Sequence, residues 1–330
     1  MTIIVDDQAT TVRQNLWTFL REYRRDGHRR LLWIDALCID QTDLNERNHQ
    51  VSIMSDIFSG AESVIAWLGL GVERDLRVVS EHTRDTEKSR HLAHLASAPE
   101  VLRQSVERVL QAEYWSRLWI VQEFVLNHGV KLWSGGCRLS SDTFASIMYP
   151  EDDMWSNRLY LRRAVQPTSQ IELAMAVIMC RNEHHHTYPS HGRFYWRSTV
   201  LVQRFKGSKC ADVRDRLFGL PGLIDPQELR DHPIHVDYTH MGVNELFMIL
   251  WERALYFAGL DAETEADFDP YLSSHREDLA AMLDLPRDHA GSLTVTLFLR
   301  FWKRSSQLRR VLADTDCNTE QALDWRSMIE

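Results

Sequence analysis

The chain has 330 residues, 44% of them hydrophobic, and 11 tryptophans, so a sizeable core is expected and global disorder is excluded. The formal net charge is −9, with acidic and basic residues interspersed, which argues against a broad nucleic-acid interface because such a surface needs a basic face. Five widely spaced cysteines without a CxxC pair argue against a disulfide framework or a four-thiolate zinc site and favour a reducing compartment.

The first part of the chain alternates between β-type runs and helical periodicity. Thr2–Val5 is a short β-rich run. Apolar residues then recur at helical spacing from Val12 to Tyr23, which predicts a helix that ends before Gly27. Leu31–Ile34 is a continuous apolar run, as expected for a strand that is buried on both faces.

A second strand–helix pattern follows. Asp43 precedes Glu46 by three positions, the spacing of a capping box, and predicts a helix over residues 45–59. Ser63–Leu68 is the next predicted strand, and a glycine ends it. Because short links join these segments, we predict that Leu31–Ile34 and Ser63–Leu68 are neighbouring parallel strands. The expected fold class is therefore α/β, with an open parallel sheet flanked by helices.

Helical signals dominate from residue 74 to about residue 125. A helix start lies at Ser97-Ala98-Pro99-Glu100, where proline occupies the first turn, and a further short helix is expected near Ser116. Gly129–Trp133 is one more predicted strand.

Beyond residue 136 the pattern is mostly helical, with loops predicted at His184–Gly192 and Lys206–Asp212. A soft boundary near residue 150 divides the chain into an α/β domain over residues 1–150 and a mostly helical C-terminal extension over residues 151–330.

Three stretches resemble the fungal heterokaryon-incompatibility (HET) domain, in the order that this family has them. The first is Leu32-Trp33-Ile34-Asp35-Ala36-Leu37-Cys38-Ile39-Asp40-Gln41, which continues through Glu46-Arg47, Gln50-Val51, Met54 and Ile57-Phe58 to Ala61, Val64 and Ala66-Trp67-Leu68-Gly69. The second is Tyr114-Trp115-Ser116-Arg117-Leu118-Trp119-Ile120-Val121-Gln122-Glu123. The third is Asp212-Val213-Arg214-Asp215-Arg216-Leu217-Phe218-Gly219-Leu220, followed by Val236-Asp237-Tyr238. The likeness is good from about residue 2 to 150 and thinner to about 260.

One block of that family is not found. HET domains usually open with a segment similar to A-L-S-Y-x-W-G on their first strand, and this sequence begins after the place where it would stand. We expect either a start site further upstream or a degenerate member of the family. A sheet without that strand would expose edges, so we expect the chain from Met1 to be weakly active or inert.

Four side chains follow directly on the predicted strand at Leu31–Ile34, namely Asp35, Cys38, Asp40 and Gln41. Ligands of open parallel sheets bind beyond the carboxyl ends of the strands, so these residues border the expected crevice. The alternative is structural: Asp40 or Asp43 caps the next helix and Cys38 is a small buried residue.

Glu123 is the candidate catalytic residue. Trp119 and Glu123 are four positions apart and share one helix face. HET domains look distantly similar to TIR domains, in which a W-C-x-x-E segment supplies the glutamate of an NAD-cleaving site, and the resemblance implies a TIR-like fold here. Cleavage of the nicotinamide–ribose bond develops positive charge on the sugar, which a carboxylate stabilises. The alternative is that Glu123 pairs with Arg117 or another arginine as part of the fold.

Other charged and aromatic groups favour structural interpretations. Arg214, Asp215 and Arg216 alternate in sign beside an apolar run, which favours an ion-pair cluster that holds the helical part against the sheet. His184-His185-His186 lacks HExxH spacing, so we expect a solvated loop and no metal site. The aromatic stripe at 298–302 favours packing. Trp33, Trp67 and Trp119 lie within apolar patterns and are expected to be buried.

The function implied by the resemblance is programmed cell death after non-self recognition, with an NAD glycohydrolase-like activity, NAD as substrate and no bound cofactor. Two alternatives stay open: a non-catalytic protein-interaction module, or an accessory protein of a metabolic gene cluster. We expect protein partners and no nucleic-acid partner, and the sequence is compatible with a homo-oligomer. The amino terminus lacks signal-peptide features, and no apolar run reaches the roughly 20 residues of a membrane span, so we expect a cytoplasmic protein without membrane contact.

Overall fold

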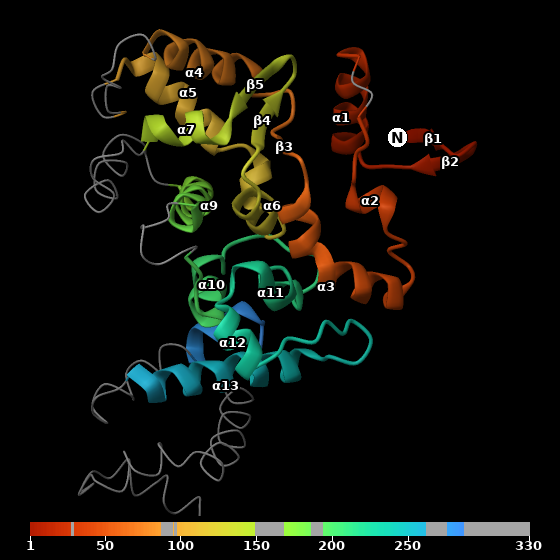
Figure 1. Ribbon diagram of the computed structural model, residues 1–330, viewed down its shortest axis with the longest axis vertical. Coiled ribbons are helices and arrows are strands. Elements are labelled where there is room, and N and C mark those ends of the chain that lie inside the picture. The colour runs from red at the N-terminus through yellow and green to blue at the C-terminus, as the bar shows by residue number, and fades with distance from the viewer. Residues whose placement is uncertain are drawn as a thin grey trace, which may run out of the picture.

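The computed structural model describes residues 1–27, 30–86, 95, 98–148, 168–185, 194–261 and 276–286. In it the strands of the main sheet lie between a single helix on one side and several helices on the other, and further helices follow below (Figure 1). The predicted boundary near residue 150, His186 and the aromatic stripe at 298–302 lie outside these residues.

The chain begins with a hairpin and a helix. β1 (Thr2–Val5) and β2 (Gln8–Thr11) pair antiparallel, and α1 (Gln14–Arg25) follows. The predicted first strand and first helix are both confirmed, whereas β2 was not predicted. Phe19 and Tyr23 form the buried face of α1 together with Glu22.

The main sheet has three strands in the order β3-β4-β5. β3 (Val64–Trp67) pairs parallel with β4 (Val130–Ser134), and β4 pairs antiparallel with β5 (Cys137–Ser140). The α/β class and the strands predicted at Ser63–Leu68 and Gly129–Trp133 are confirmed. The sheet is small and mixed, so the open parallel sheet that we predicted is not observed in the described residues.

Leu31–Ile34 is not a strand, and this prediction was wrong. The segment passes without regular structure into α2 (Asp35–Cys38), because the Ile34 carbonyl accepts hydrogen bonds from the Leu37 and Cys38 amides. Leu31 is fully exposed, while Leu32 and Ile34 pack against α1 and the aromatic side of the sheet. An apolar run becomes a strand only when another strand lies beside it to pair with its backbone, and β3 pairs with β4 here.

The helix that crosses from α2 to β3 is confirmed as α3 (Leu44–Gly60). Asp43 caps it by accepting hydrogen bonds from the Asn45 and Glu46 amides. The Glu46 carboxylate reaches back to the Asp40 amide at 3.1 Å instead of to Asp43, so only half of the predicted capping box forms.

The other helices continue the chain in a mostly helical arrangement, as predicted. Before residue 150 they are α4 (Glu73–Thr86), α5 (Glu100–Leu110), η2 (Glu113–Ser116), α6 (Ile120–Leu126) and α7 (Ser141–Met148). After it they are α9 (Ser169–His185), α10 (Ser198–Arg204), α11 (Asp215–Phe218), η3 (Pro221–Leu223), α12 (Pro226–Asp231) and α13 (Val243–Asp261). A short helix at 276–282 closes the described part.

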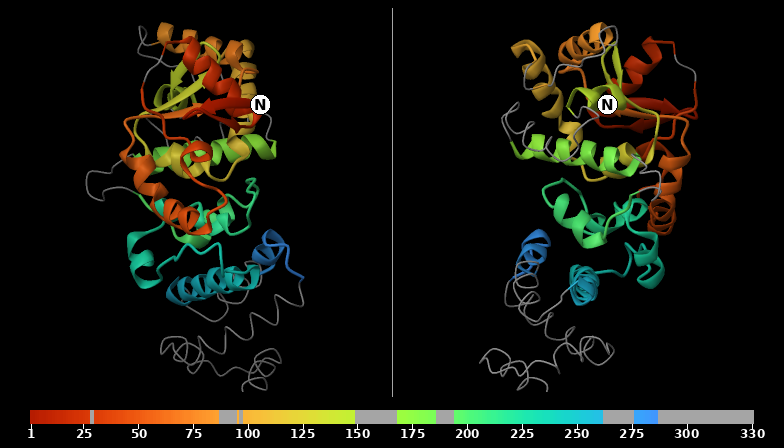
Figure 2. Two further views of the ribbon diagram at one scale, coloured as in Figure 1. Left: turned by 90° about the vertical axis from the view of Figure 1, so that its right-hand side faces the viewer. Right: turned by 60° about the vertical axis from the view of Figure 1, so that its left-hand side comes forward.

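The two faces of the sheet have different cores. Trp67 and Trp133 are register partners, and their rings pack edge to face with centroids 6.3 Å apart. Both belong to a cluster with Phe19 and Tyr23 of α1. The opposite face, with Ala66 and Leu132, joins a second and larger cluster that continues through α6 and α9 into α13. Figure 2 shows the helical part lying directly below the sheet.

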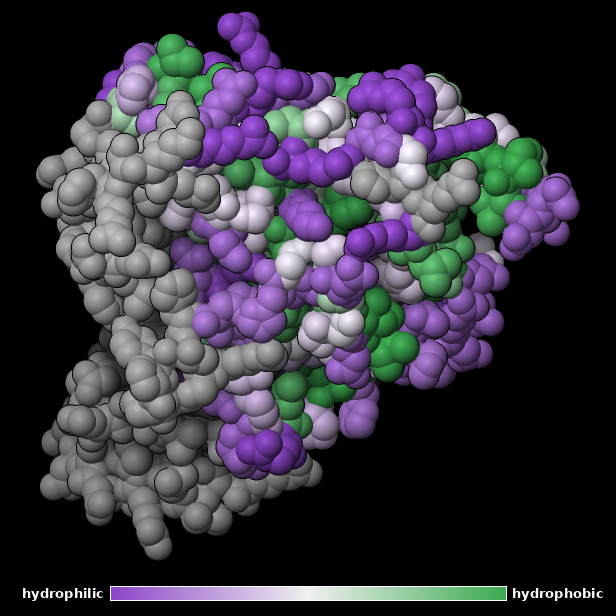
Figure 3. Space-filling view, turned by 45° about the horizontal axis from the view of Figure 1, so that its top comes forward, coloured by the Kyte–Doolittle hydropathy of each residue, from purple (hydrophilic) through white to green (hydrophobic). Residues whose placement is uncertain are grey.

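Three tryptophans were expected to be buried, and the outcome differs among them. Trp67 is buried with 8% exposure, Trp119 is partly buried, and Trp33 retains 37% exposure. The expectation for Trp33 was wrong because the segment around it is not inside a sheet. The face shown in Figure 3 is mostly hydrophilic, with hydrophobic residues in smaller separate patches. No helix of the described residues is long and apolar enough to span a membrane.

Candidate functional site

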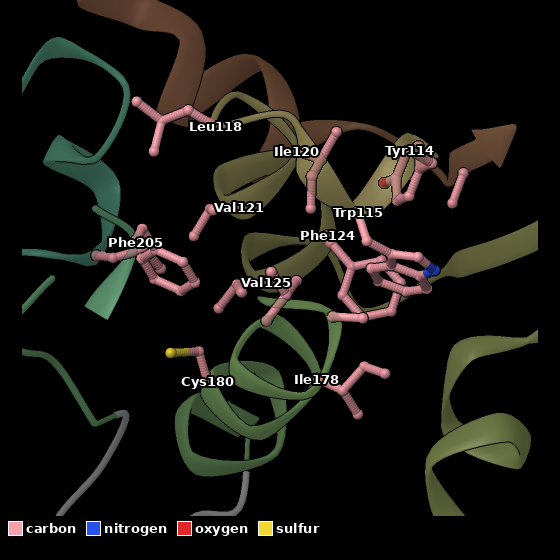
Figure 4. Packing of buried hydrophobic residues seen from close by; sticks show 14 of the residues in the cluster. Tyr114, Trp115, Leu118, Ile120, Val121, Phe124, Val125, Ile178, Cys180 and Phe205 are labelled. Carbon is pink, nitrogen blue, oxygen red and sulfur yellow. The ribbon is translucent and has the colours of Figure 1, made fainter. Parts of the chain in front are cut away.

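Helix α6 carries Glu123 and is preceded by an extended link. The link from Ser116 to Leu118 pairs with Lys209, whose carbonyl accepts from the Leu118 amide at 2.9 Å. Trp119 is the N-cap residue of α6, one turn before Glu123. The apolar side of α6 packs on α9, where Phe124 and Val125 lie above Ile178 and Cys180 (Figure 4).

α6 leads into β4, which fixes where the site lies. The side-chain amide of Asn127 donates to the carbonyls of Phe58 at 2.8 Å and Ala61 at 2.7 Å, just before β3 begins. Helix α6, which carries Glu123, therefore lies toward the amino ends of β3 and β4 (Figure 1), whereas the predicted crevice lies beyond the carboxyl ends of strands. The reason is that the candidate helix precedes its strand in the chain.

The Glu123 carboxyl is half-buried and lies among three polar neighbours. Burial raises its pKa above the ordinary value and the charge of Asp35 raises it further, while Arg117 and the Tyr114 hydroxyl act in the opposite direction. Tyr114 is buried, and burial together with the nearby Glu123 charge raises the pKa of its hydroxyl. No ion pair within 4.0 Å joins Glu123 to Arg117 among the described side chains.

The structure thus brings Asp35 and Trp119 near Glu123. Cys38, Asp40 and Gln41 are exposed and take part in local turns. Asp40 accepts from the Thr42 hydroxyl at 2.6 Å and from its amide at 2.9 Å, and these bonds lower the pKa of Asp40. The Cys38 sulfur accepts from the Ile34 amide at 3.5 Å, and the Gln41 side-chain amide donates to the Asp35 carbonyl at 3.3 Å. Their predicted ligand role stays a prediction.

Asp215 joins all three of the stretches singled out in the sequence. Its two carboxylate oxygens accept from Trp119 Nε1 at 3.1 Å and from the Tyr238 hydroxyl at 2.5 Å. Arg47 of α3 lies 3.8 Å from the same carboxylate and stacks on the Tyr238 ring at 3.7 Å. Asp215 is 2% exposed, and burial raises its pKa. These contacts agree with the structural interpretation of the charge cluster.

Arg214, next to Asp215 in sequence, binds the chain segments around Asp212 and Tyr238. It pairs with Asp212 at 2.7 Å and donates to the Tyr238 carbonyl at 2.6 Å. The bonds from Arg214 offset the effect of burial and lower the pKa of Asp212.

Helix α9 closes the other end of α6 through side chains that the sequence did not indicate. The buried Arg181 guanidinium donates to the carbonyls of Phe124 at 2.9 Å and His128 at 2.8 Å, and also to that of Asn127. A ring nitrogen of His185 lies 2.7 Å from the Val125 carbonyl. Carbonyls at a helix end need such partners when they are buried.

The expected solvated loop at His184–Gly192 was wrong for its first two residues, and residues 186–192 lie outside the described part. His184 and His185 belong to the last turn of α9, and His184 is fully buried. Burial and the charge of Arg181 lower the pKa of His185 to about 3, so its ring is neutral. Among the described residues, no group of three or more His, Cys, Asp or Glu side chains is placed to hold a metal ion.

Two residues of this site escaped the sequence reasoning. Tyr114 belongs to the second stretch that resembles the family, nine residues before Glu123. Its proximity to Glu123 could not be predicted from helical spacing, because an extended link separates the two residues. Arg181 gave no signal at all, since its partners are backbone carbonyls 53 to 57 residues away.

The comparison with known proteins agrees with the first two stretches, which lie within the matched residues. Residues 1–123 match the model of the family described as Heterokaryon incompatibility protein (HET). Heterokaryon incompatibility protein 6, OR allele, of Neurospora crassa is 31% identical over 141 residues, which cover 32% of this chain and 21% of that protein. The chain thus spans about a fifth of the length of this curated relative. No solved structure matches the chain. Residues 1–123 are thus similar to the heterokaryon incompatibility (HET) family, which confirms the resemblance inferred from the sequence.

Proposed function

We propose that this protein acts in non-self recognition and promotes programmed cell death. The proposal is supported by the family match over residues 1–123 and by the heterokaryon incompatibility protein of Neurospora crassa that is 31% identical over 141 residues. The four cysteines of the described residues are free thiols, which agrees with action in the reducing cytoplasm. Protein partners and self-association stay predictions.

The mechanism we propose is cleavage of NAD, with Glu123 as the catalytic carboxylate. The observation that carries it is a half-buried carboxyl near Tyr114 and Asp35, on a helix whose two ends are fixed by other elements. A carboxylate in such surroundings stabilises an oxocarbenium-like transition state strongly, because little water screens its charge. Arg117 and Tyr114 favour the charged form that this role needs.

The second candidate is a non-catalytic interaction module. It is favoured by the exposed apolar side chains around α2, of which Leu31 is fully exposed and Trp33 37% exposed. Exposed large apolar residues of this kind mark surfaces that other proteins cover.

The test compares Glu123→Gln with wild type in fungal cells, with both expressed together with the upstream coding sequence that supplies the A-L-S-Y-x-W-G-like block. The substitution keeps the size of the side chain and removes its charge, so we expect wild type to deplete NAD and arrest growth and the variant to do neither. The matched control is Glu113→Gln, which removes an exposed carboxylate of η2 and should behave as wild type. Cell death that persists in Glu123→Gln with steady NAD would favour the interaction module.

A further inference from the structure

Trp119 connects two features of the molecule that lie far apart in the chain. Its backbone is the N-cap of α6, and its indole nitrogen donates to Asp215 across 96 residues of sequence. A seven-residue helix has only two turns, and Glu123 lies in the first of them, so the place of the N-cap residue sets the direction of Glu123.

Asp215 is itself held so firmly that it can serve as a fixed point. The Tyr238 hydroxyl donates to the second carboxylate oxygen of Asp215 at 2.5 Å. The Tyr238 amide in turn donates to the side-chain oxygen of Asn48 in α3 at 2.8 Å. The Phe218 ring packs edge-on against Tyr238 with centroids 5.2 Å apart. The carboxylate is thus tied to α3, to α11 and to the chain before α13.

We propose that Asp215 is a positioning residue for Glu123, acting through Trp119. This proposal rests on the proposed function for its catalytic meaning, although the placement of the Glu123 carboxyl can be measured without any activity. The charge of Asp215 matters less than its two acceptor oxygens, because one orients Trp119 and the other fixes Asp215 against Tyr238.

A second contact limits the same helix from the side. Gln122, adjacent to Glu123, accepts from the Gly222 amide at 2.9 Å, and a Cβ at Gly222 would lie 2.8 Å from the Gln122 oxygen. Because this contact restrains the side of α6, loss of Asp215 should rotate the first turn of the helix without unfolding it.

The test uses the full chain and four variants. Asp215→Ala removes both acceptors, and Asp215→Asn restores them in part, since the amide oxygen can face Trp119 and the amide nitrogen can donate to the Tyr238 oxygen. Trp119→Phe keeps an aromatic ring and removes the donor, which covers the case in which Asp215→Ala does not fold. Asp212→Ala is the matched control, because Asp212 pairs with Arg214 in the same cluster and does not bond to Trp119.

Two quantities are measured for each variant: the protonation midpoint of Glu123 from ¹³C-carboxyl NMR, assigned with Glu123→Gln, and the pH profile of NAD cleavage. The groups that face Glu123 are Tyr114, Arg117 and Asp35, and no variant alters them. In Asp215→Ala and Trp119→Phe we expect the midpoint to fall toward the ordinary value and the rate to drop by about 10²-fold, the loss typical of a 1 Å misplacement. Asp215→Asn should recover most of both, and Asp212→Ala should change neither.

The result that overturns the proposal is an unchanged Glu123 midpoint in both Asp215→Ala and Trp119→Phe, whatever their stability. If the wild-type chain does not cleave NAD, the proposed activity fails, and the midpoints still decide whether Asp215 positions the carboxyl. A fall of the midpoint in Asp212→Ala equal to that in Asp215→Ala would also overturn it, because the effect would then belong to the whole ion cluster.

Discussion

The Trp67 side chain is enclosed by rings from two other elements. Phe19 lies 5.7 Å and Trp133 6.3 Å from it between centroids, and its indole nitrogen donates to Asn15 at 3.0 Å. Trp67→Ala should therefore lower the free energy of unfolding by about 3–5 kcal/mol, the range for a buried aromatic residue. Urea denaturation followed by circular dichroism measures this loss.

Trp33 provides the contrast. It is 37% exposed and meets the Phe58 ring edge-on, with ring centroids 5.9 Å apart. Trp33→Ala should lower the free energy of unfolding by only about 1 kcal/mol, as for an average substitution. Equal losses in the two variants would show that the segment around Trp33 is packed like the sheet.

Glu123 should also make stability depend on pH. Burial raises the pKa of its carboxyl above the ordinary value of 4.5, so the folded chain binds the proton more tightly than the unfolded chain. The free energy of unfolding of wild type therefore falls as pH rises from the unfolded pKa through the raised folded pKa, and this loss is constant above it. Glu123→Gln cannot ionise and should lack that loss.

The unfolding free energy of Glu123→Gln minus that of wild type should thus be larger at neutral pH than in acid. The measurement is the difference in unfolding free energy between the two proteins in a series from about pH 4 to about pH 8, in which other titrating groups such as Asp215 largely cancel. A difference that does not vary with pH would mean that the carboxyl is as well solvated in the folded as in the unfolded chain.

At the scale of elements, α9 closes the carboxyl end of α6. Arg181 is 2% exposed and donates to carbonyls of Phe124, Asn127 and His128 and to the Asp142 carboxylate at 3.0 Å. Arg181→Met keeps the length of the side chain and removes the donor from the buried carbonyls of Phe124 and Asn127. Each lost partner costs about 1–3 kcal/mol, so we expect a total loss of about 3 kcal/mol or more.

The control for this prediction is Arg30→Met. Arg30 pairs with Glu62, and both side chains are mostly exposed, at 68% and 80%. Such a surface pair contributes at most about 1 kcal/mol. Thermal unfolding of the two variants should separate clearly, and similar losses would show that α6 does not depend on α9 for its carboxyl-terminal end.

Elements with local signals were predictable from sequence. Asp43 stands before an apolar helical pattern, and its carboxylate needs only the two nearest amides to cap α3. Gly135, at the first position of the β4–β5 turn, has φ +53, and a Cβ there would lie 2.0 Å from the Glu73 carboxylate. Glycines at such a turn are a local signal of strand reversal, yet β5, which follows them, was not predicted.

Elements whose partners are distant in sequence were not predictable. Leu31–Ile34 has a strand composition, yet nothing local states which strand would pair with it, and the structure leaves it unpaired. The same limit applies to the candidate site. Glu123 and Asp35 were identified, whereas Arg181, which holds the helix, lies 58 residues from Glu123. Tertiary contacts of this range leave no periodic pattern in a single sequence.

At the scale of the molecule, the larger core is continuous across the predicted boundary. It includes Ala66 and Leu132 of the sheet, Ile178 of α9 and Leu250 of α13 in one cluster. Polar contacts cross in the same place, where the Leu118 amide bonds to the Lys209 carbonyl and Trp119 bonds to Asp215. The residues matched by the family end at 123, in the middle of this interface.

We therefore expect the sheet and the helices α9 to α13 to unfold together. Calorimetry should give one transition whose calorimetric and van't Hoff enthalpies agree, the criterion for a single cooperative unit. Amide hydrogen exchange should assign β4 and α10 the same opening free energy, because neither keeps its core when the other is lost. Asp215→Ala should move the whole transition to lower temperature without splitting it, since the bond to Trp119 is one of several links across the interface. Two separate transitions, with β4 and α10 exchanging at different free energies, would instead mean that residues 1–150 and 151–330 are independent domains that only touch.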